Sequence, residues 1–480
     1  MISDYSRALL LASTATDVSG DLQEHLERQI VVVSCAPDPG CVCAAQILLT
    51  VLRRLPLALA FDGQGLDDEE MRAIHAAVAA VDPARPLREE HDGGIRVHLG
   101  FRASAGTLLV IPSRHGAHVV RDGRLIDALP VSPLGSCVAA AMAAAEIFKD
   151  AVLARPERRY DPPHTAFCPV TLSDRPEDAK DLALPFAFSG ALVGLGAIGS
   201  ATAMILAELE TTGDIDLVDR QRYGNENITT YSLGGRADAK AAMWKTELAE
   251  RALVRARCRR FNDGVEHYVA DVQAGVIAPP AIVLAGLDSV EARHETQRLW
   301  PDLLIDGATG DTMLGMHVVH GAGQPCMQCF LRPRTAPSSY KRLSEITGLP
   351  IAKLRDGDAV LTEADLANAT DEQRSVLAAQ LGKKICGLAQ AVGLTDIPSE
   401  GFQPSVAFVA LGAACLIVGR LVAERLGIAP AENFVQYDAL IGPVARTADE
   451  RKTVRGCYCV ERATTIKRLR ERRFMSTREI

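Results

Sequence analysis

Residues 186–199 read FAFSGALVGLGAIG, an apolar segment that runs directly into three glycines. Gly194, Gly196 and Gly199 form the pattern G-x-G-x-x-G between this expected strand and an apolar helix expected over residues 197–209. In that setting the glycines permit a tight turn and let backbone N–H groups approach a phosphate at the helix N-terminus. The motif predicts a nucleotide site but does not distinguish NAD from ATP.

The strand after the glycine loop ends in a carboxylate. Residues 214–219 read DIDLVD, and Asp219 stands about 20 residues beyond the loop, where a carboxylate can accept hydrogen bonds from ribose hydroxyls. This position strengthens the prediction of a nucleotide.

Strands and helices alternate through the rest of this region. Expected strands cover residues 267–272, 281–287, 302–308 and 316–320, and expected helices cover residues 239–255 and 289–299. Such alternation implies βαβ units and a largely parallel, doubly wound sheet.

The first half of the chain repeats this layout more faintly. Expected strands cover residues 29–35, 57–61, 95–101 and 107–111, and expected helices cover residues 41–52, 67–81 and 137–153. Its first strand is followed by APDPGC over residues 36–41, where prolines offer no N–H to a phosphate. We therefore expect a degenerate copy that folds like a nucleotide domain but binds no nucleotide.

Further polar residues follow the glycine loop in a distinctive order. They are Asp219, Asn227, Lys245 (or Lys240), Asp288 with Arg293, and the pair Cys326 and Cys329. In order and approximate spacing this set resembles the ThiF-type adenylyltransferase superfamily, which includes ubiquitin-activating enzymes and the activators of sulfur-carrier proteins. The resemblance covers residues 187–330 well and the first half by architecture only. Residues 5–11 also resemble the family's N-terminal Tyr-x-Arg segment.

The resemblance implies roles for individual residues. Asp288 would hold Mg²⁺, Lys245 and Asn227 would contact phosphate oxygens of ATP, and Arg7 would reach the site from the inactive half. Attack of a carboxylate on the α-phosphate brings negative groups together, so a metal ion and cations are the groups that this chemistry needs.

Two positions depart from the family pattern. Thr230 stands where the family has an arginine, and Gln221 stands where it has a second acid. Arg222 or Arg236 could replace the missing arginine, and the sequence does not choose between them.

Two close cysteine pairs lie far apart in the chain. Cys326 and Cys329 form one pair, and Cys457 and Cys459 form the other. Four thiolates in tetrahedral geometry make a closed structural zinc site, and the resemblance implies the same pairing of an early and a late pair. The alternative is four reduced cysteines without a metal.

Residues 331–403 interrupt the alternation of strands and helices. Cys386 is the only cysteine there, with Lys383 and Lys384 nearby to favour its thiolate. In ubiquitin-activating enzymes the thioester-forming cysteine lies in an insertion at this point, whereas sulfur-carrier activators have a shorter segment. Cys386 is the expected nucleophile, with a buried apolar cysteine as the alternative.

The expected organisation is α/β, with two Rossmann-like doubly wound domains and a helical cysteine-bearing insertion. The inactive domain covers residues 1–154, a proline-rich linker 155–186, the active ATP-binding domain 187–330, the cysteine insertion 331–403, and the C-terminal part of the active domain 404–480.

Bulk composition narrows the partners. The 480 residues carry a net charge of −8, which disfavours binding to nucleic acid or anionic membranes. No apolar run reaches the roughly 20 residues needed to span a bilayer. The 12 cysteines then suggest buried residues, ligands or nucleophiles in a reducing cytoplasm rather than disulfides.

We therefore expect ATP-dependent adenylation of the C-terminal glycine of a ubiquitin-like protein, thioester formation on Cys386, and transfer to a conjugating enzyme. The resemblance extends to relatives in bacterial ubiquitin-like conjugation operons that serve antiphage defence. The alternatives are a sulfur-carrier adenylyltransferase, an NAD-dependent oxidoreductase and a catalytically dead scaffold. The chain could act as a monomeric pseudo-dimer or as a homodimer.

Overall fold

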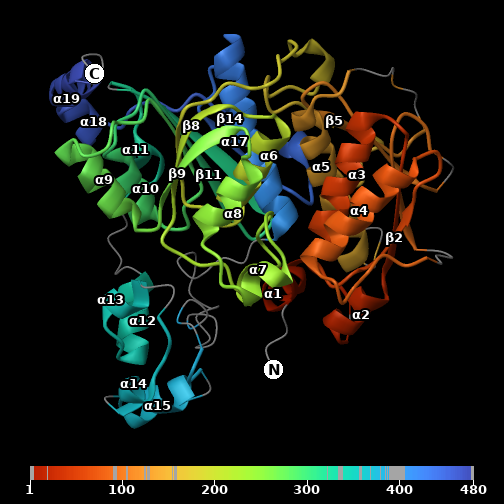
Figure 1. Ribbon diagram of the computed structural model, residues 1–480, viewed down its shortest axis with the longest axis horizontal. Coiled ribbons are helices and arrows are strands. Elements are labelled where there is room, and N and C mark those ends of the chain that lie inside the picture. The colour runs from red at the N-terminus through yellow and green to blue at the C-terminus, as the bar shows by residue number, and fades with distance from the viewer. Residues whose placement is uncertain are drawn as a thin grey trace. The chain divides into compact units, whose positions relative to one another are not determined.

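The computed structural model shows two compact units, Met1–Leu331 together with Ser405–Ile480, and Arg332–Pro404 (Figure 1). It describes residues 5–476 except residues 19, 90–93, 104–105, 124–125, 127–129, 154, 156–158, 322, 333–338, 356–358, 368, 379, 384, 386–387 and 389–405. The first unit holds both nucleotide-type halves, and the second holds the insertion.

The N-terminal half contains a six-stranded sheet in the order β2-β1-β3-β4-β5-β6. The first four strands are parallel, and β5 and β6 are antiparallel. The strands are β1 (Ile30–Cys35), β2 (Ala58–Asp62), β3 (Ile95–Leu99), β4 (Leu108–Pro112), β5 (Ala117–Val120) and β6 (His164–Phe167). The helices are α1 (Ser6–Ala15), α2 (Leu22–Arg28), α3 (Pro39–Leu52), α4 (Asp68–Val81) and α5 (Pro133–Val152).

The C-terminal half contains an eight-stranded sheet in the order β14-β13-β12-β11-β10-β7-β8-β9. Strands β9, β8, β7, β10 and β11 are parallel, and the other three are antiparallel. The strands are β7 (Gly190–Val193), β8 (Gly213–Val218), β9 (Ala256–Phe261), β10 (Ile282–Ala285), β11 (Leu303–Gly310), β12 (Met313–His320), β13 (Phe434–Asp438) and β14 (Thr447–Asp449). The helices are α6 (Ala197–Glu208), α7 (Arg236–Lys240), α8 (Lys245–Ala252), α9 (Val265–Ala274), α10 (Val290–Gln297), α11 (Met327–Phe330), α17 (Ala407–Leu426), α18 (Tyr458–Glu461) and α19 (Ala463–Ser476).

The two sheets repeat one topology. The order β2-β1-β3-β4-β5-β6 matches β8-β7-β10-β11-β12-β13, with the same strand directions. Helix α3 follows β1 as α6 follows β7, and α5 precedes β6 as α17 precedes β13. This repetition confirms the expected pair of Rossmann-like domains. The expectation of a largely parallel sheet holds only for the first strands of each half, because the later strands form an antiparallel meander.

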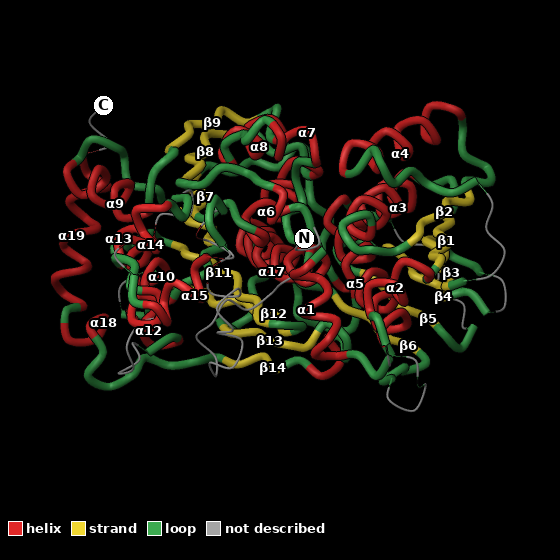
Figure 2. The backbone as a smooth tube through the Cα atoms, turned by 90° about the horizontal axis from the view of Figure 1, so that it is seen from below, coloured by secondary structure: helices red, strands yellow, loops and turns green. Residues whose placement is uncertain are grey.

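Four helices lie between the sheets, α3 and α5 from one half and α6 and α17 from the other (Figure 2). Helices α5 and α17 pack on each other as well as on their own partners. Seventeen of the twenty residues of each are buried, and alanine and glycine let the backbones approach closely. The halves therefore share one continuous core.

Helix α17 corrects one expectation from the sequence. Its 20 residues are long and apolar enough to cross a membrane by length and composition, although Arg420 interrupts the run. The most apolar window is 94% buried within the structure, between the sheet and neighbouring helices. The core helix of a globular domain can be equally long and apolar, and α17 is such a core helix.

Some predicted elements are wrong. Residues 267–272 belong to α9, whose buried Val265, Tyr268, Val269 and Val272 follow helical rather than strand spacing. The helix expected over residues 239–255 is two shorter helices, α7 and α8. Strand β9, which reads ARCRRF, was also not predicted from the sequence. This strand lies at an edge of the sheet, where polar side chains are tolerated, so its sequence lacks the apolar pattern of a strand.

The segment expected to be a linker is only partly one. Residues 155–186 include β6, which pairs with β5 and so completes the N-terminal sheet. Cys168 and Val170, just beyond the strand, are fully buried. The first half therefore extends past residue 154.

The unit Arg332–Pro404 is helical where it is described. It contains α12 (Ser339–Thr347), α13 (Ile351–Arg355), α14 (Glu363–Ala367) and α15 (Asp371–Ala378). A small core of its own includes Leu343, Leu354 and Leu377. Cys386 and Lys384 lie outside the described residues, and Lys383 is exposed.

Candidate nucleotide and zinc sites

The glycine loop joins β7 to α6, and its three glycines have different surroundings. Gly194 has φ +78°, and a Cβ there would lie 2.7 Å from Leu287. A Cβ on Gly199 would collide with the carbonyl oxygen of Gly194, so this glycine permits close packing of helix and strand. Gly196 caps α6, and the nearest atom to a Cβ there is the Gly286 oxygen at 4.0 Å. The loop thus leaves open space at the helix N-terminus, where a phosphate would fit.

Asp219 lies directly beneath this loop. Its Oδ2 accepts the Leu195 N–H at 2.7 Å, and its Oδ1 accepts the Gln221 N–H at 2.7 Å. Burial raises the pKa of Asp219, and the charge of Lys245 acts in the opposite direction. The carboxylate therefore braces the loop at the place where a ribose would be bound.

The structure separates the two lysines that the sequence left open. Lys245 begins α8, is only 3% exposed, and donates from Nζ to Gln221 Oε1 at 2.6 Å. Lys240 ends α7 and is exposed. Only Lys245 is placed beside Asp219, so it is the lysine that the geometry favours for a phosphate.

Asn227 ends a single 3-10 turn, Asn225–Asn227, after β8. Its Oδ1 accepts the Gly224 N–H at 3.1 Å, which leaves its amide NH₂ group available to a ligand. Thr230 is buried, and its hydroxyl donates back to the Asn227 carbonyl oxygen at 3.3 Å. Thr230 therefore maintains the turn and supplies no positive charge.

Neither proposed substitute for the missing arginine is aimed at a phosphate. Arg222 stacks on the Trp244 ring at 3.9 Å and donates to the Ala242 carbonyl oxygen. Arg236 pairs with Asp82 of the other half, 2.8 Å from Nε to Oδ1. Both arginines have structural partners.

Asp288 follows β10 and precedes α10. It is exposed and forms no hydrogen bond or ion pair with another described residue. Burial is the main reason for the raised pKa of Asp219, and the negative charge of Asp288 adds to it. The two carboxylates thus lie close enough to interact, and Asp288 is free to bind a cation.

Arg293 binds the backbone of this turn and does not pair with Asp288. Its Nη2 donates to the Leu287 carbonyl oxygen at 2.8 Å, and its Nη1 lies 3.4 Å from Asp306 Oδ2. Asp306 Oδ2 also contacts His317 Nδ1 at 2.9 Å. This buried network fixes the backbone immediately before Asp288.

The N-terminal half reaches into the loop that carries these groups. Arg54 is 1% exposed and donates to the carbonyl oxygens of Ile228, Ser232 and Gly234 at 3.0–3.1 Å. A Cβ on Gly235 would collide with the Ala80 carbonyl oxygen, so the two halves are in close contact. The sequence did not single out Arg54. The signal was present, because Arg53 and Arg54 interrupt an otherwise apolar stretch.

Arg7 lies in α1, and its backbone alone is described. Two residues earlier, the Tyr5 hydroxyl contacts Asp82 Oδ2 at 3.5 Å, and the Arg85 guanidinium lies over the Tyr5 ring. Because Asp82 also pairs with Arg236, the start of α1 is anchored beside the active half.

The four predicted zinc ligands converge. Cys326 precedes α11 and Cys457 precedes α18, and their sulfurs lie 3.6 Å apart. Cys329 and Cys459 lie 3.5 Å apart, and all four Sγ atoms are within 4.8 Å of one another. Zinc–sulfur bonds of about 2.3 Å in a tetrahedron separate the sulfurs by about 3.8 Å. The arrangement therefore fits a zinc ion.

Comparison with known proteins gives the family. The ThiF family matches residues 185–458, more than half of the chain. The chain belongs to the ThiF family. The sequence resemblance is thus confirmed, and with it the expectation of a nucleotide-using adenylyltransferase. A search of curated proteins finds no match.

Three solved structures are similar to parts of the chain at low identity. The crystal structure of E. coli MccB with MccA is 12% identical, with a TM-score of 0.36, over 57% of this chain and 67% of that one. PaaA is 10% identical, with a TM-score of 0.33, over 55% and 65%. E. coli TcdA, a tRNA N6-threonylcarbamoyladenosine dehydratase, is 14% identical, with a TM-score of 0.27, over 49% and 85%.

In the N-terminal half of this ThiF-family chain, side chains occupy the start of α3, the position that corresponds to the glycine loop at the start of α6. Asp38 caps α3, and its Oδ1 accepts the Gly40 N–H at 3.0 Å. A Cβ on Gly40 would collide with the Val131 side chain. A carboxylate and an apolar side chain thus lie at the N-terminal end of α3, whereas the glycine loop leaves the start of α6 uncovered.

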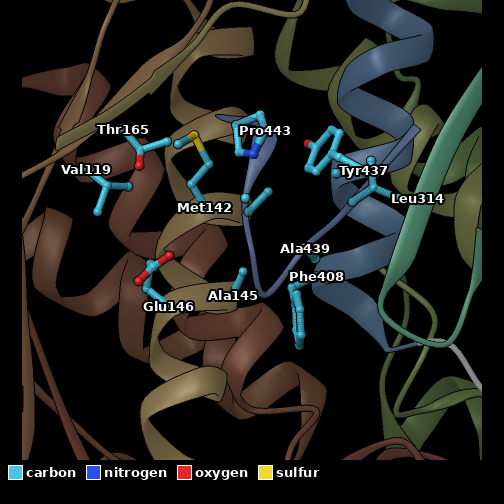
Figure 3. Close-up of a pocket in the computed structure, with 13 residues that line it drawn as sticks. Val119, Met142, Ala145, Glu146, Thr165, Leu314, Phe408, Tyr437, Ala439 and Pro443 are labelled. Carbon is cyan, nitrogen blue, oxygen red and sulfur yellow. The ribbon is translucent and has the colours of Figure 1, made fainter. Parts of the chain in front are cut away.

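A separate small cleft, partly open to solvent, lies between the halves (Figure 3). Met142 of α5 faces Phe408 of α17 and Tyr437 of β13 across it. Glu146 is the one carboxylate among the described lining residues, and it pairs with Lys149 at 2.7 Å and with Arg121. Of the predicted site residues whose side chains the structure describes, none lines this cleft.

Proposed function

We propose that the chain uses ATP and Mg²⁺ to adenylate the C-terminal carboxylate of a ubiquitin-like protein. The carboxylate oxygen attacks the α-phosphorus, the bond from that phosphorus to the bridging oxygen breaks, and pyrophosphate leaves. The acyl-adenylate then reacts with the Cys386 thiolate, which forms a C–S bond and releases AMP. A conjugating enzyme would take the acyl group onto its own cysteine.

The observation that carries this proposal is the placement of Lys245. A nearly buried ammonium lies beside Asp219, beneath a glycine loop whose helix N-terminus is open. This combination favours a ligand with both a ribose and several phosphate charges. Burial strengthens the attraction between the ammonium and a phosphate because nearby water is limited.

Asp288 is the residue that would hold the magnesium ion. Its carboxylate is exposed, free of partners among the described residues, and close to Asp219. A bound Mg²⁺ would neutralise charge that develops on the phosphates. Arg293 orients the preceding backbone, so Asp288 is presented from a fixed turn.

Thioester formation rests on Cys386, for which the other cysteines offer no substitute. Four are grouped as metal ligands. Burial raises the pKa of the thiols of Cys35 and Cys41 to about 12 and of Cys258 to about 11, and it also raises the pKa of the thiols of Cys43, Cys137, Cys168 and Cys415. A thiol that stays protonated is a poor nucleophile, so the eleven described cysteines are unsuited to the step.

The cytoplasm would supply ATP and keep these thiols reduced. The pseudo-dimeric fold supplies one working site from one chain, so a monomer would suffice. A sulfur-carrier activator that stops at the adenylate is the alternative. Family membership argues against the NAD-dependent oxidoreductase.

The test is ATP–pyrophosphate exchange by the full chain with a small protein ending in glycine. We expect exchange in the parent and in Cys386→Ser, and a reductant-sensitive protein adduct in the parent alone. An adduct that survives in Cys386→Ser contradicts the thioester assignment. Exchange that persists in Asp288→Ala contradicts the role of Asp288, and a parent that binds ATP without exchange supports the scaffold.

A further inference from the structure

Two consecutive arginines follow α3, and both are buried. Arg53 is 2% exposed and Arg54 is 1% exposed. Arg53 donates to the carbonyl oxygens of Arg85 and Leu57, which belong to its own half. Arg54 donates to three carbonyl oxygens of the other half. Arg53 therefore serves as a matched control for Arg54, because only Arg54 connects the two halves.

The three acceptors of Arg54 surround one turn of the active half. Ile228 and Ser232 lie on either side of Thr230, and Gly234 lies two residues further along. The turn begins immediately after Asn227, the proposed phosphate ligand. Arg54 forms no ion pair with a described carboxylate. Its charge is stabilised by the backbone dipoles of this turn together with the nearby side chains of Tyr223 and Asp238.

The same turn also contacts the helix that starts at the glycine loop. The Ser232 N–H donates to Ser200 Oγ at 3.0 Å. Ser200 lies in the first turn of α6, and its own N–H donates to the Gly196 carbonyl oxygen at 2.9 Å. Ser232 is therefore held by Arg54 through its carbonyl and by α6 through its N–H.

We propose that Arg54 is a positioning residue for the nucleotide, through which the inactive half holds the Ile228–Gly234 turn against the glycine-loop helix. It does not touch phosphate itself, because its Nη1 and Nη2 groups point to carbonyl oxygens. Its planar fork reaches three acceptors at once, which a compact lysine ammonium on a flexible stem would not reproduce. This inference rests on the proposed ATP site.

The experiment compares Arg54→Lys with Arg53→Lys in the full chain. Both variants lose a buried guanidinium, but only Arg54→Lys loses contacts to the active half. ATP affinity is measured by calorimetric titration with Mg²⁺ present, and stability by thermal unfolding. We expect ATP affinity to fall about tenfold or more in Arg54→Lys and to stay within about twofold of the parent in Arg53→Lys, since 1.4 kcal/mol is tenfold.

Equal losses of affinity in both variants would overturn the inference, as would unchanged affinity in Arg54→Lys. If the unaltered chain binds no ATP, the proposed function fails instead. Should Arg54→Lys not fold, amide hydrogen exchange of the unaltered chain decides. Amides of residues 230–235 should exchange as slowly as those of α6, and rapid exchange would contradict a fixed turn.

Discussion

Arg236 of the active half and Asp82 of the inactive half form an ion pair, 2.8 Å from Nε to Oδ1. Asp82 is 1% exposed and also contacts the Tyr5 hydroxyl at the start of α1. One buried carboxylate therefore connects the start of α1 to Arg236, which follows the Ile228–Gly234 turn.

Removing this ion pair should weaken both stability and nucleotide binding. In a double-mutant cycle with Asp82→Asn and Arg236→Gln, we expect a coupling energy of about 1–3 kcal/mol in unfolding free energy. Urea unfolding of the four proteins measures it. Additive effects would show that the pair is not coupled. Arg257→Gln, which removes an exposed ion pair with Asp214, is the control and should cost little.

Lys245 and Lys240 should differ sharply in nucleotide binding. Lys245→Met keeps the apolar part of the side chain but removes the ammonium beside Asp219. We expect ATP affinity to fall about 10- to 100-fold, the range of a hydrogen bond to a charged group. Lys240→Met is the matched control and should bind ATP as the parent does. Titration calorimetry with Mg²⁺ measures both, and the reverse order of effects would refute the assignment of Lys245.

We expect the four-cysteine cluster to bind zinc and to stabilise the C-terminal part of the chain. The unaltered chain should contain one zinc ion, because four sulfurs converge at distances that fit. Cys457→Ser should lose zinc and lower the melting temperature, since the site joins α11 to α18. Cys258→Ser changes a half-buried thiol of β9 and should keep the metal. Elemental analysis provides the measurement, and zinc-free parent protein of full stability would contradict the site.

Acid should destabilise the N-terminal half through His118. Its ring is 5% exposed, stacks on His164, and burial lowers its pKa to about 4. The unfolded chain takes up a proton near pH 6.5 while the folded chain does not, so stability rises with pH between about 4 and 6.5. From pH 7.5 to pH 5 this costs about 2 kcal/mol.

The variant His118→Phe should remove that part of the pH dependence. Urea unfolding at pH 7.5 and pH 5 gives the difference for parent and variant. His75, an exposed histidine of α4, supplies the control His75→Gln, which should retain the parent's dependence. An unchanged slope in His118→Phe would show that another group is responsible.

The sequence predicted the parts of the site that depend on local patterns. The glycine loop, Asp219 and the cysteine pairs all have short-range signatures, and the loop and the cysteine cluster appear as expected. Lys245 emerged only as one of two candidates, because burial decides between them and burial depends on tertiary packing. Cys386 stays a prediction from sequence.

The contacts between the two halves could not be predicted from the sequence. Arg54 meets residues 228–234 through a fold that brings together positions more than 170 apart in the chain. From the sequence, Arg293 was only part of a pattern with Asp288, and its ion pair with the buried Asp306 depends on tertiary packing. Strand β9 was missed because an edge strand needs no apolar alternation.

ATP–pyrophosphate exchange driven by a small protein with a C-terminal glycine tests the adenylation claim most directly. We expect exchange that requires Mg²⁺ and the free C-terminal carboxylate, persists in Cys386→Ser, and disappears in Asp288→Ala. Exchange that is unchanged in Asp288→Ala, or that proceeds when the C-terminal carboxylate is amidated, would contradict it.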